Sequence, residues 1–310
     1  MQAATLTGLI AVLIWGASLP ITRLLQEQVG MLALTGIVNG IAGLLGLLRL
    51  RMMKQRFPDK TVLSQPRLYL RWFFFVLHAL CVITAVYIVQ RSHLPFVLLI
   101  NYIWPTAIIV FSVILAGVAI TRWWAFIAGS VVVLASLGME IIGPDGFSYH
   151  LFENVTDCIA YAVAFVGAIA WGLYSAFSRR DGDATGGGSV IPLFQLTMAL
   201  ALPVAFATGT AHFENVTFWW WVAIAAQSTA TLIAYLTWDY GMRQGSVVAL
   251  SLCADFIPWV SLTAAWLLLG SPISATTIIS AVTLVAGAML TRYGTLPRRA
   301  KRIADDHVLD

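Results

Sequence analysis

Charged residues are scarce in this 310-residue chain, where Asp, Glu, Lys and Arg make up 10% and hydrophobic residues make up 60%. A water-soluble domain of this length exposes many side chains and must cover much of its surface with polar groups. The scarcity of charge therefore excludes a soluble globular protein. A lipid bilayer, which solvates apolar side chains, is the environment that fits this composition.

Groups that carry enzymatic or metal chemistry are equally scarce. The three cysteines each lie in an apolar stretch and lack the spacing of a metal site, so we interpret Cys81, Cys158 and Cys253 as small core residues. The sequence contains no nucleophile with a neighbouring base and no phosphate-binding glycine loop before a helix. It therefore predicts no enzyme, no catalytic or metal site and no cofactor.

Ten stretches are long and apolar enough to cross a bilayer as helices, which takes about 20 residues each. They cover roughly residues 4–25, 31–49, 69–90, 95–118, 123–143, 158–178, 190–209, 217–240, 246–270 and 275–293. These stretches account for nearly the whole chain. The sequence therefore predicts an all-α membrane protein with ten transmembrane helices, short connections and no separate soluble domain.

Basic residues are distributed unevenly between the two sides of the predicted membrane. If the N-terminus is cytoplasmic and the helices alternate, sixteen of the eighteen Lys and Arg residues lie on the cytoplasmic side, and only Arg23 and Arg91 lie outside. This asymmetry follows the positive-inside rule. It predicts that both termini are cytoplasmic. Because the basic residues serve to orient the helices in the membrane, the net charge of +4 does not indicate a nucleic-acid partner, and none is expected.

The two halves of the chain resemble each other weakly. Trp15-Gly16 matches Trp171-Gly172 at an offset of 156 residues, and Pro105 matches Pro258 at an offset of 153. A weak repeat in a hydrophobic chain is typical of secondary transporters built from two halves.

The number of predicted helices sets the relation between these halves. We predict a first five-helix repeat over residues 1–150, a second over residues 151–293 and a basic cytoplasmic tail over residues 294–310. Because five is odd, the second repeat enters the membrane in the opposite orientation to the first. Inverted repeats of this kind predict a substrate site near the midplane, between the halves.

Two prolines interrupt equivalent predicted helices. Pro105 lies in the fourth stretch and Pro258 in the ninth, and each lacks an N–H group and so frees a carbonyl one turn earlier. In lipid, such a helix must be packed in protein or line a cavity. We predict that both prolines kink their helices beside a substrate site. A kink that only shapes helix packing is the alternative.

Aromatic and polar residues near the predicted membrane centre are the candidates for substrate contact. A surface that mixes aromatic rings with hydroxyls and amides suits an amphiphilic ligand with a flat apolar part. Helix packing alone is the alternative for each of these residues. The candidates are Trp15, His78, Asn101, Tyr102, Trp104, Trp171, Tyr235, Trp238, Asp255 and Trp259.

Two of these candidates are titratable groups deep in a predicted span. Three roles fit Asp255, which are proton coupling, recognition of a substrate amino group, and hydrogen-bonded packing. Two roles fit His78, which are a proton relay and a core residue whose hydrogen bonds are satisfied.

The pattern of repeats and motifs resembles a known family. Ten spans in two repeats, the paired Trp-Gly motifs and the paired prolines resemble the drug/metabolite transporter superfamily with its EamA-type repeats. The motif Asn101-Tyr102-Ile103-Trp104-Pro105 resembles the bacterial aromatic amino acid exporters within it. The resemblance carries over to Trp171 as well, but not to His78 or Asp255.

The resemblance implies the function. It implies a transporter in the bacterial inner membrane that exports aromatic amino acids or similar small amphiphilic metabolites by alternating access. A broad-specificity drug or metabolite exporter of the same superfamily is the alternative, and a membrane-embedded enzyme or a sensor fits less well. The expected partners are a small-molecule substrate and the lipid bilayer, whereas the oligomeric state stays open.

Overall fold

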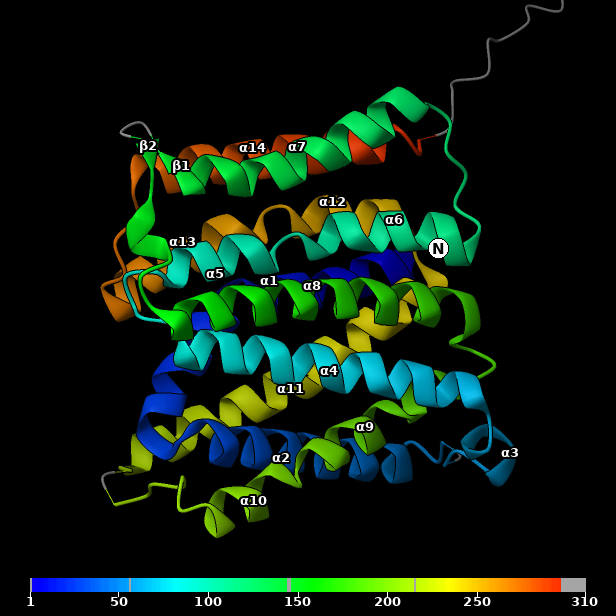
Figure 1. The fold of residues 1–310 in the computed structure, drawn as a ribbon. Helices are drawn as coiled ribbons and strands as arrows, with labels where there is room; N and C mark the ends of the chain where they lie inside the picture. Colours follow the sequence, from blue (N-terminus) through cyan, green and yellow to red (C-terminus); the bar gives the residue numbers. More distant parts are fainter. Residues whose placement is uncertain (1, 56, 144–145, 215, 297–310) are drawn as a thin grey trace, which may run out of the picture.

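The computed structural model describes residues 2–55, 57–143, 146–214 and 216–296, which form one bundle of long helices (Figure 1). Most of the predicted basic tail, from residue 297 onward, lies outside the described residues. The prediction of an all-α fold is confirmed, since the only strands in the described residues are a two-residue antiparallel pair, β1 (Ile142–Gly143) and β2 (Gly146–Phe147).

The helices follow the apolar stretches closely. In chain order they are α1 (Gln2–Val29), α2 (Met31–Met52), α3 (Lys60–Leu63), α4 (Pro66–Ile88), α5 (Leu94–Asn101), α6 (Trp104–Ala116), α7 (Trp123–Ile141), α8 (Val155–Asp181), α9 (Ile191–Met198), α10 (Ala201–Ala207), α11 (Phe218–Gln244), α12 (Val247–Ala254), α13 (Ile257–Leu269) and α14 (Ala275–Tyr293). Two 3-10 turns, η1 (Tyr149–Leu151) and η2 (Gly187–Ser189), lie in the connections.

Nine segments of the described chain are long and apolar enough to span a membrane. Helix α11 is not among them. It is 27 residues long, but it carries three consecutive tryptophans together with Gln, Ser, Thr and Tyr, which lower its mean hydropathy. Nine of the ten predicted spans are therefore found among the described residues, and a tenth span at α11 stays a prediction.

The connections between the helices lie at the two ends of the bundle (Figure 1). The start of α1, the α3 segment, the α6–α7 and α8–α9 connections and the end of α14 all lie at the right-hand end in Figure 1. We call this the basic end, because it contains most of the Lys and Arg residues that the sequence analysis assigned to the cytoplasm. The α1–α2 turn at Gly30 lies at the opposite end.

Two helical segments are interrupted in the same way. Helices α5 and α12 have eight residues each, helices α6 and α13 have thirteen each, and a two-residue break separates the members of each pair. Pro105 and Pro258 each occupy the first turn after the break, where a missing N–H costs nothing. The structure thus breaks both helices at the predicted prolines. It also breaks the seventh span between α9 and α10, which we did not predict.

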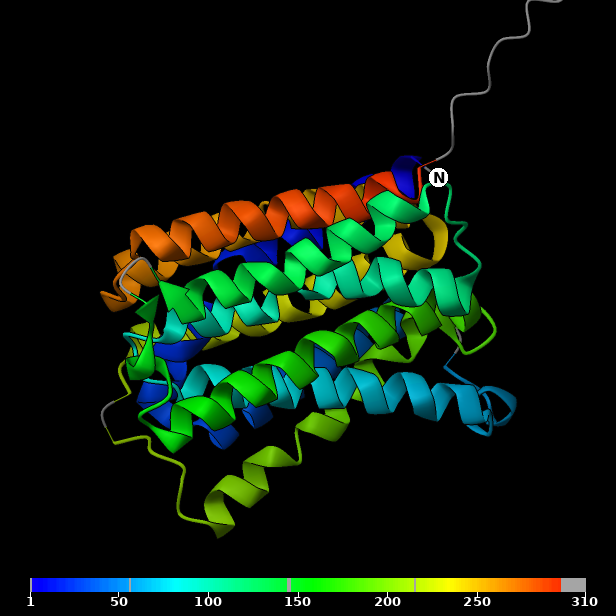
Figure 2. The ribbon, with the colours of Figure 1, turned by 45° about the horizontal axis from the view of Figure 1, so that its top comes forward.

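The outermost helices pack closely through glycine. Helices α7 and α14 run side by side at one edge of the bundle (Figure 2). A Cβ atom at Gly129 would lie 2.2 Å from the backbone nitrogen of Thr291, and one at Gly287 would lie 2.7 Å from that of Val133. Only glycine permits this approach, as in other membrane helix pairs.

Candidate functional site

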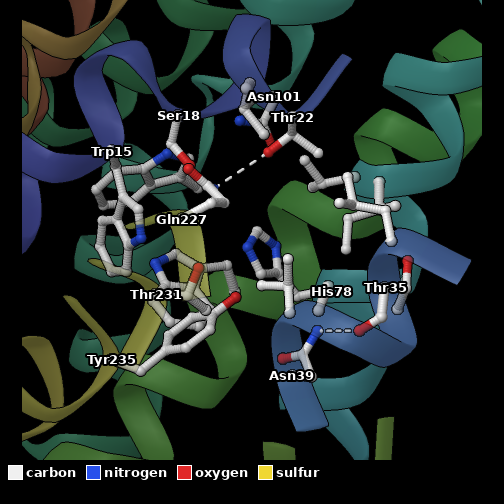
Figure 3. A pocket seen from close by; sticks show the side chains of 18 of the residues that line it. Trp15, Ser18, Thr22, Thr35, Asn39, His78, Asn101, Gln227, Thr231 and Tyr235 are labelled. Atoms are coloured by element: carbon white, nitrogen blue, oxygen red, sulfur yellow. Dashed lines mark hydrogen bonds between the residues drawn. The ribbon is translucent and has the colours of Figure 1, made fainter. Parts of the chain in front are cut away.

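A cavity of about 900 Å³, counting the solvent space that adjoins it, lies in the middle of the bundle. Helices α1, α2, α4, α5, α8 and α11 supply most of its wall (Figure 3). Its residues on α2, α4 and α11 run from Leu34 to Asn39, from His78 to Ile83 and from Gln227 to Tyr235. The cavity therefore lies nearer the end of the bundle opposite the basic end, between elements of both halves.

Most of the predicted site residues meet at this cavity. Seven of the ten line it, namely Trp15, His78, Asn101, Tyr102, Trp104, Trp171 and Tyr235. Trp238 lies behind the wall, fully buried, with its indole N–H donating to Ser175 Oγ at 3.1 Å. Asp255 and Trp259 are not among the lining residues. The first seven side chains thus lie where a bound substrate could touch them, and the other three lie outside the lining of this cavity.

Four tryptophans form a cluster at the cavity wall, three of them lining it and Trp238 packed behind them. The Trp15 ring centroid lies 5.3 Å from Trp171, 6.2 Å from Trp104 and 5.2 Å from Trp238. The Trp15 contacts with Trp104 and Trp171 are edge-to-face, a favoured geometry worth about 0.5–1.5 kcal/mol per pair beyond area burial. These contacts fix the orientations of the four rings relative to one another.

His78 projects between the polar parts of the wall (Figure 3). Its Nδ1 lies 2.9 Å from the carbonyl oxygen of Gly167, and its ring lies 4.6 Å from the Trp171 ring. A carbonyl oxygen can only accept, so Nδ1 must carry a hydrogen. In the neutral ring, Nε2 is then the free acceptor. The hydrogen bond to Gly167 is what the core-residue role requires. The proton-relay role stays a prediction.

Tyr102 connects the two halves. Its hydroxyl is hydrogen-bonded to Ser261 Oγ on α13, and Ser261 Oγ donates to the carbonyl oxygen of Gly16 on α1. All three residues are buried. This chain of hydrogen bonds holds the break between α5 and α6 against the second broken helix.

Asp255 has an ion-pair partner that the sequence analysis did not identify. Arg292 on α14 donates to both carboxylate oxygens, at 3.1 Å to Oδ1 and more closely to Oδ2. The two side chains are only 4% and 3% exposed. The pairing was missed because residues 37 apart in sequence, on different helices, carry no periodic signal of contact.

A second network of buried ion pairs lies toward the basic end. Arg71 and Asp239 are fully buried, and Arg71 Nη2 donates to Asp239 Oδ1 at 2.8 Å. Arg71 Nη1 also donates to Thr185 Oγ1 at 2.6 Å, and Arg243 Nε donates to Asp239 Oδ2 at 2.8 Å. The network joins α4 and α11 to the connection between α8 and α9. None of its members lines the cavity.

Several polar residues of the wall escaped the sequence analysis. These are Ser18 and Thr22 on α1 and Thr35 and Asn39 on α2. A usable signal existed, because Trp15, Ser18 and Thr22 are spaced three and four residues apart and share one face of a helix. Ser and Thr are common in membrane helices, and this spacing alone does not separate a cavity face from a packing face.

Comparison with known proteins finds similar transporters. Residues 159–293 match the model of the EamA-like transporter family. The aromatic amino acid exporter YddG of Salmonella typhimurium is 26% identical over 304 residues, which cover 96% of this chain and 99% of that protein. The exporter of the same name from Escherichia coli is 26% identical, with 95% and 98% coverage.

A solved crystal structure also superposes on this chain with a TM-score of 0.68 and 23% identity, covering 95% of this chain and 98% of that one, which shows the shared fold. The predicted resemblance to EamA-type transporters and aromatic amino acid exporters is confirmed.

Proposed function

We propose that this multi-pass membrane transporter exports aromatic amino acids or similar small amphiphilic metabolites across the bacterial inner membrane by alternating access. The observation that carries the proposal is the central cavity, whose wall combines five aromatic side chains, three from Trp and two from Tyr, with hydroxyls and carboxamides. Such a wall suits a ligand with a flat apolar ring and a polar head. Relatives named as aromatic amino acid exporters, aligned over nearly the whole chain, support the same substrate class.

The arrangement of helices supports the proposed mechanism. We infer ten spans in two inverted five-helix repeats, residues 1–150 and 151–293, with α11 as the span of lowest hydropathy. The equal lengths of the broken pairs α5–α6 and α12–α13 support this division. The cavity takes residues from α1, α5 and α11, so a movement of one repeat against the other would open it to alternate sides.

The cavity can be tested through Trp171, which is 2% exposed and lines the wall beside Trp15 and His78. Trp171→Ala should weaken the apparent affinity for tryptophan about 5- to 150-fold, because a lost ring contact is worth roughly 1–3 kcal/mol. The measurement is the half-saturating concentration for counterflow in proteoliposomes, at matched amounts of folded protein. Trp123→Ala, at an exposed ring outside the cavity, is the control and should change it less than twofold. An unchanged value for Trp171→Ala would assign this ring to packing.

Orientation is tested by labelling cysteines from outside intact cells. Ala184, in the α8–α9 connection at the basic end, and Glu214, between α10 and α11 at the opposite end, are both exposed. In a background without the three native cysteines, Ala184→Cys should resist a membrane-impermeant thiol reagent, whereas Glu214→Cys should react. The positive-inside asymmetry gives this expectation. The reverse pattern would overturn the proposed orientation.

A further inference from the structure

Four uncharged polar side chains gather at one part of the cavity wall. They are Ser18 and Thr22 on α1, Asn101 at the end of α5 and Gln227 on α11 (Figure 3). We call these four residues the head-group cluster. Gln227 Nε2 donates to Ser18 Oγ at 3.0 Å and to Thr22 Oγ1 at 3.3 Å.

The two hydroxyls of the cluster have protons to donate. Each oxygen accepts a hydrogen bond from Gln227, and neither donates to any group among the described residues. This differs from Thr7 on the same helix, whose hydroxyl donates to the carbonyl oxygen of Ala3 at 2.9 Å. Ser18 and Thr22 therefore present two donors to a ligand.

The two carboxamides supply acceptors. Asn101 is 4% exposed, and its Oδ1 atom is buried without a hydrogen-bond partner in the described part of the chain. This oxygen is enclosed in the present conformation, so a ligand donor would reach it after the Asn101 side chain turns toward the cavity, and the bond would then satisfy an otherwise unpaired acceptor. Gln227 commits its nitrogen to the hydroxyls, which leaves its carbonyl oxygen as a second acceptor.

The cavity wall carries no formal charge. Its lining residues in the described chain include no Asp, Glu, Lys or Arg, and His78 is the one titratable side chain besides tyrosines. A ligand with a net charge would enter this site without a counter-charge, which is costly in a low-dielectric environment. A zwitterion brings both charges and needs only donors on one side and acceptors on the other.

We propose that the head-group cluster binds the zwitterionic α-amino acid group of the substrate. The hydroxyls of Ser18 and Thr22 donate to the carboxylate, and the amide oxygens of Asn101 and Gln227 accept from the ammonium group. The aromatic ring of the substrate then lies against Trp15 and Trp171. This assignment rests on the proposed function, and it adds that the transporter selects substrates with no net charge.

The first test uses tryptophan analogues that lack one charge. Tryptamine lacks the carboxylate, and indole-3-propionate lacks the ammonium group. Each should inhibit counterflow of labelled tryptophan at least about 10-fold more weakly than unlabelled tryptophan, because a hydrogen bond to a charged group contributes more than 1 kcal/mol. Inhibition by either analogue as strong as that by tryptophan would overturn the proposed head-group site.

The second test compares two isosteric substitutions on α1. Thr22→Val removes a hydroxyl whose proton is free to donate to a ligand, and it should raise the half-saturating tryptophan concentration about 10-fold. Thr7→Val removes a hydroxyl that only bonds its own helix and should change it less than twofold. Thr22→Ser keeps the hydroxyl and should restore most of the affinity. Equal values for Thr22→Val and Thr7→Val would overturn the proposal.

Different results would contradict the proposed function and the head-group assignment. A wild-type protein that exchanges no aromatic amino acid would contradict the proposed function, and the head-group assignment would fail with it. A wild-type protein that exchanges tryptophan, but whose affinity is insensitive to Thr22→Val, would contradict the head-group assignment alone.

Discussion

Asp239→Leu is expected to destabilise the folded protein by about 3–5 kcal/mol, because it leaves Arg71 buried without a counter-charge. Arg71 is fully buried, and Asp239 is its only acidic partner among the described residues. Its remaining hydrogen bonds go to Thr185 and to the carbonyl oxygen of Gly182, which are uncharged. The measurement is the thermal unfolding midpoint of the purified protein in detergent.

The reciprocal substitution should cost less. After Arg71→Met, Asp239 keeps the 2.8 Å hydrogen bond from Arg243 Nε, so the carboxylate retains a counter-charge. The double variant Asp239→Leu with Arg71→Met should recover much of the stability lost in Asp239→Leu, because no uncompensated charge remains at this site. Equal costs for the two single substitutions and no recovery in the double variant would contradict this description of the network.

Asp255→Leu should cause a similar loss of stability, about 3–5 kcal/mol, by leaving Arg292 buried in its span without a partner. The pair is 4% and 3% exposed, and the only other hydrogen-bond acceptor of Arg292 in the described chain is the carbonyl oxygen of Ser251, at 3.2 Å. Because Asp255 does not line the cavity, the folded fraction of the variant should keep its affinity for substrate.

This prediction separates the three roles that the sequence left open for Asp255. A normal unfolding midpoint together with weakened substrate exchange would favour recognition of an amino group. A normal midpoint together with a lost response to a pH gradient would favour proton coupling. A lowered midpoint with unchanged affinity is the result that the ion pair with Arg292 predicts.

The helices were predictable because membrane spanning imposes a strong and local signal. The predicted stretch 275–293 coincides with α14, and the stretch 31–49 falls short of the end of α2 by three residues. The breaks at Pro105 and Pro258 were also predictable, since proline removes a backbone donor wherever it lies. The break between α9 and α10 also precedes a proline, Pro203 in the first turn of α10, so the same signal was present there and was overlooked.

The candidate site was predictable only in part. Large aromatic residues such as Trp15, Trp104 and Trp171 are conspicuous in sequence, and the structure places all three at the cavity. Ser18 and Thr22 are small and have many equivalents elsewhere in the membrane helices. Partners such as Asp255 and Arg292, or Arg71 and Asp239, are brought together by tertiary packing, which hydropathy and periodicity do not encode.

Counterflow in proteoliposomes tests the central claim most directly. Purified protein is reconstituted in vesicles loaded with unlabelled amino acid, and uptake of the labelled form is followed for a panel of aromatic, aliphatic, acidic and basic amino acids. The account predicts transient accumulation of labelled tryptophan, phenylalanine or tyrosine, with little accumulation of arginine or glutamate. No accumulation of any aromatic amino acid, or equal accumulation of the charged ones, would contradict it.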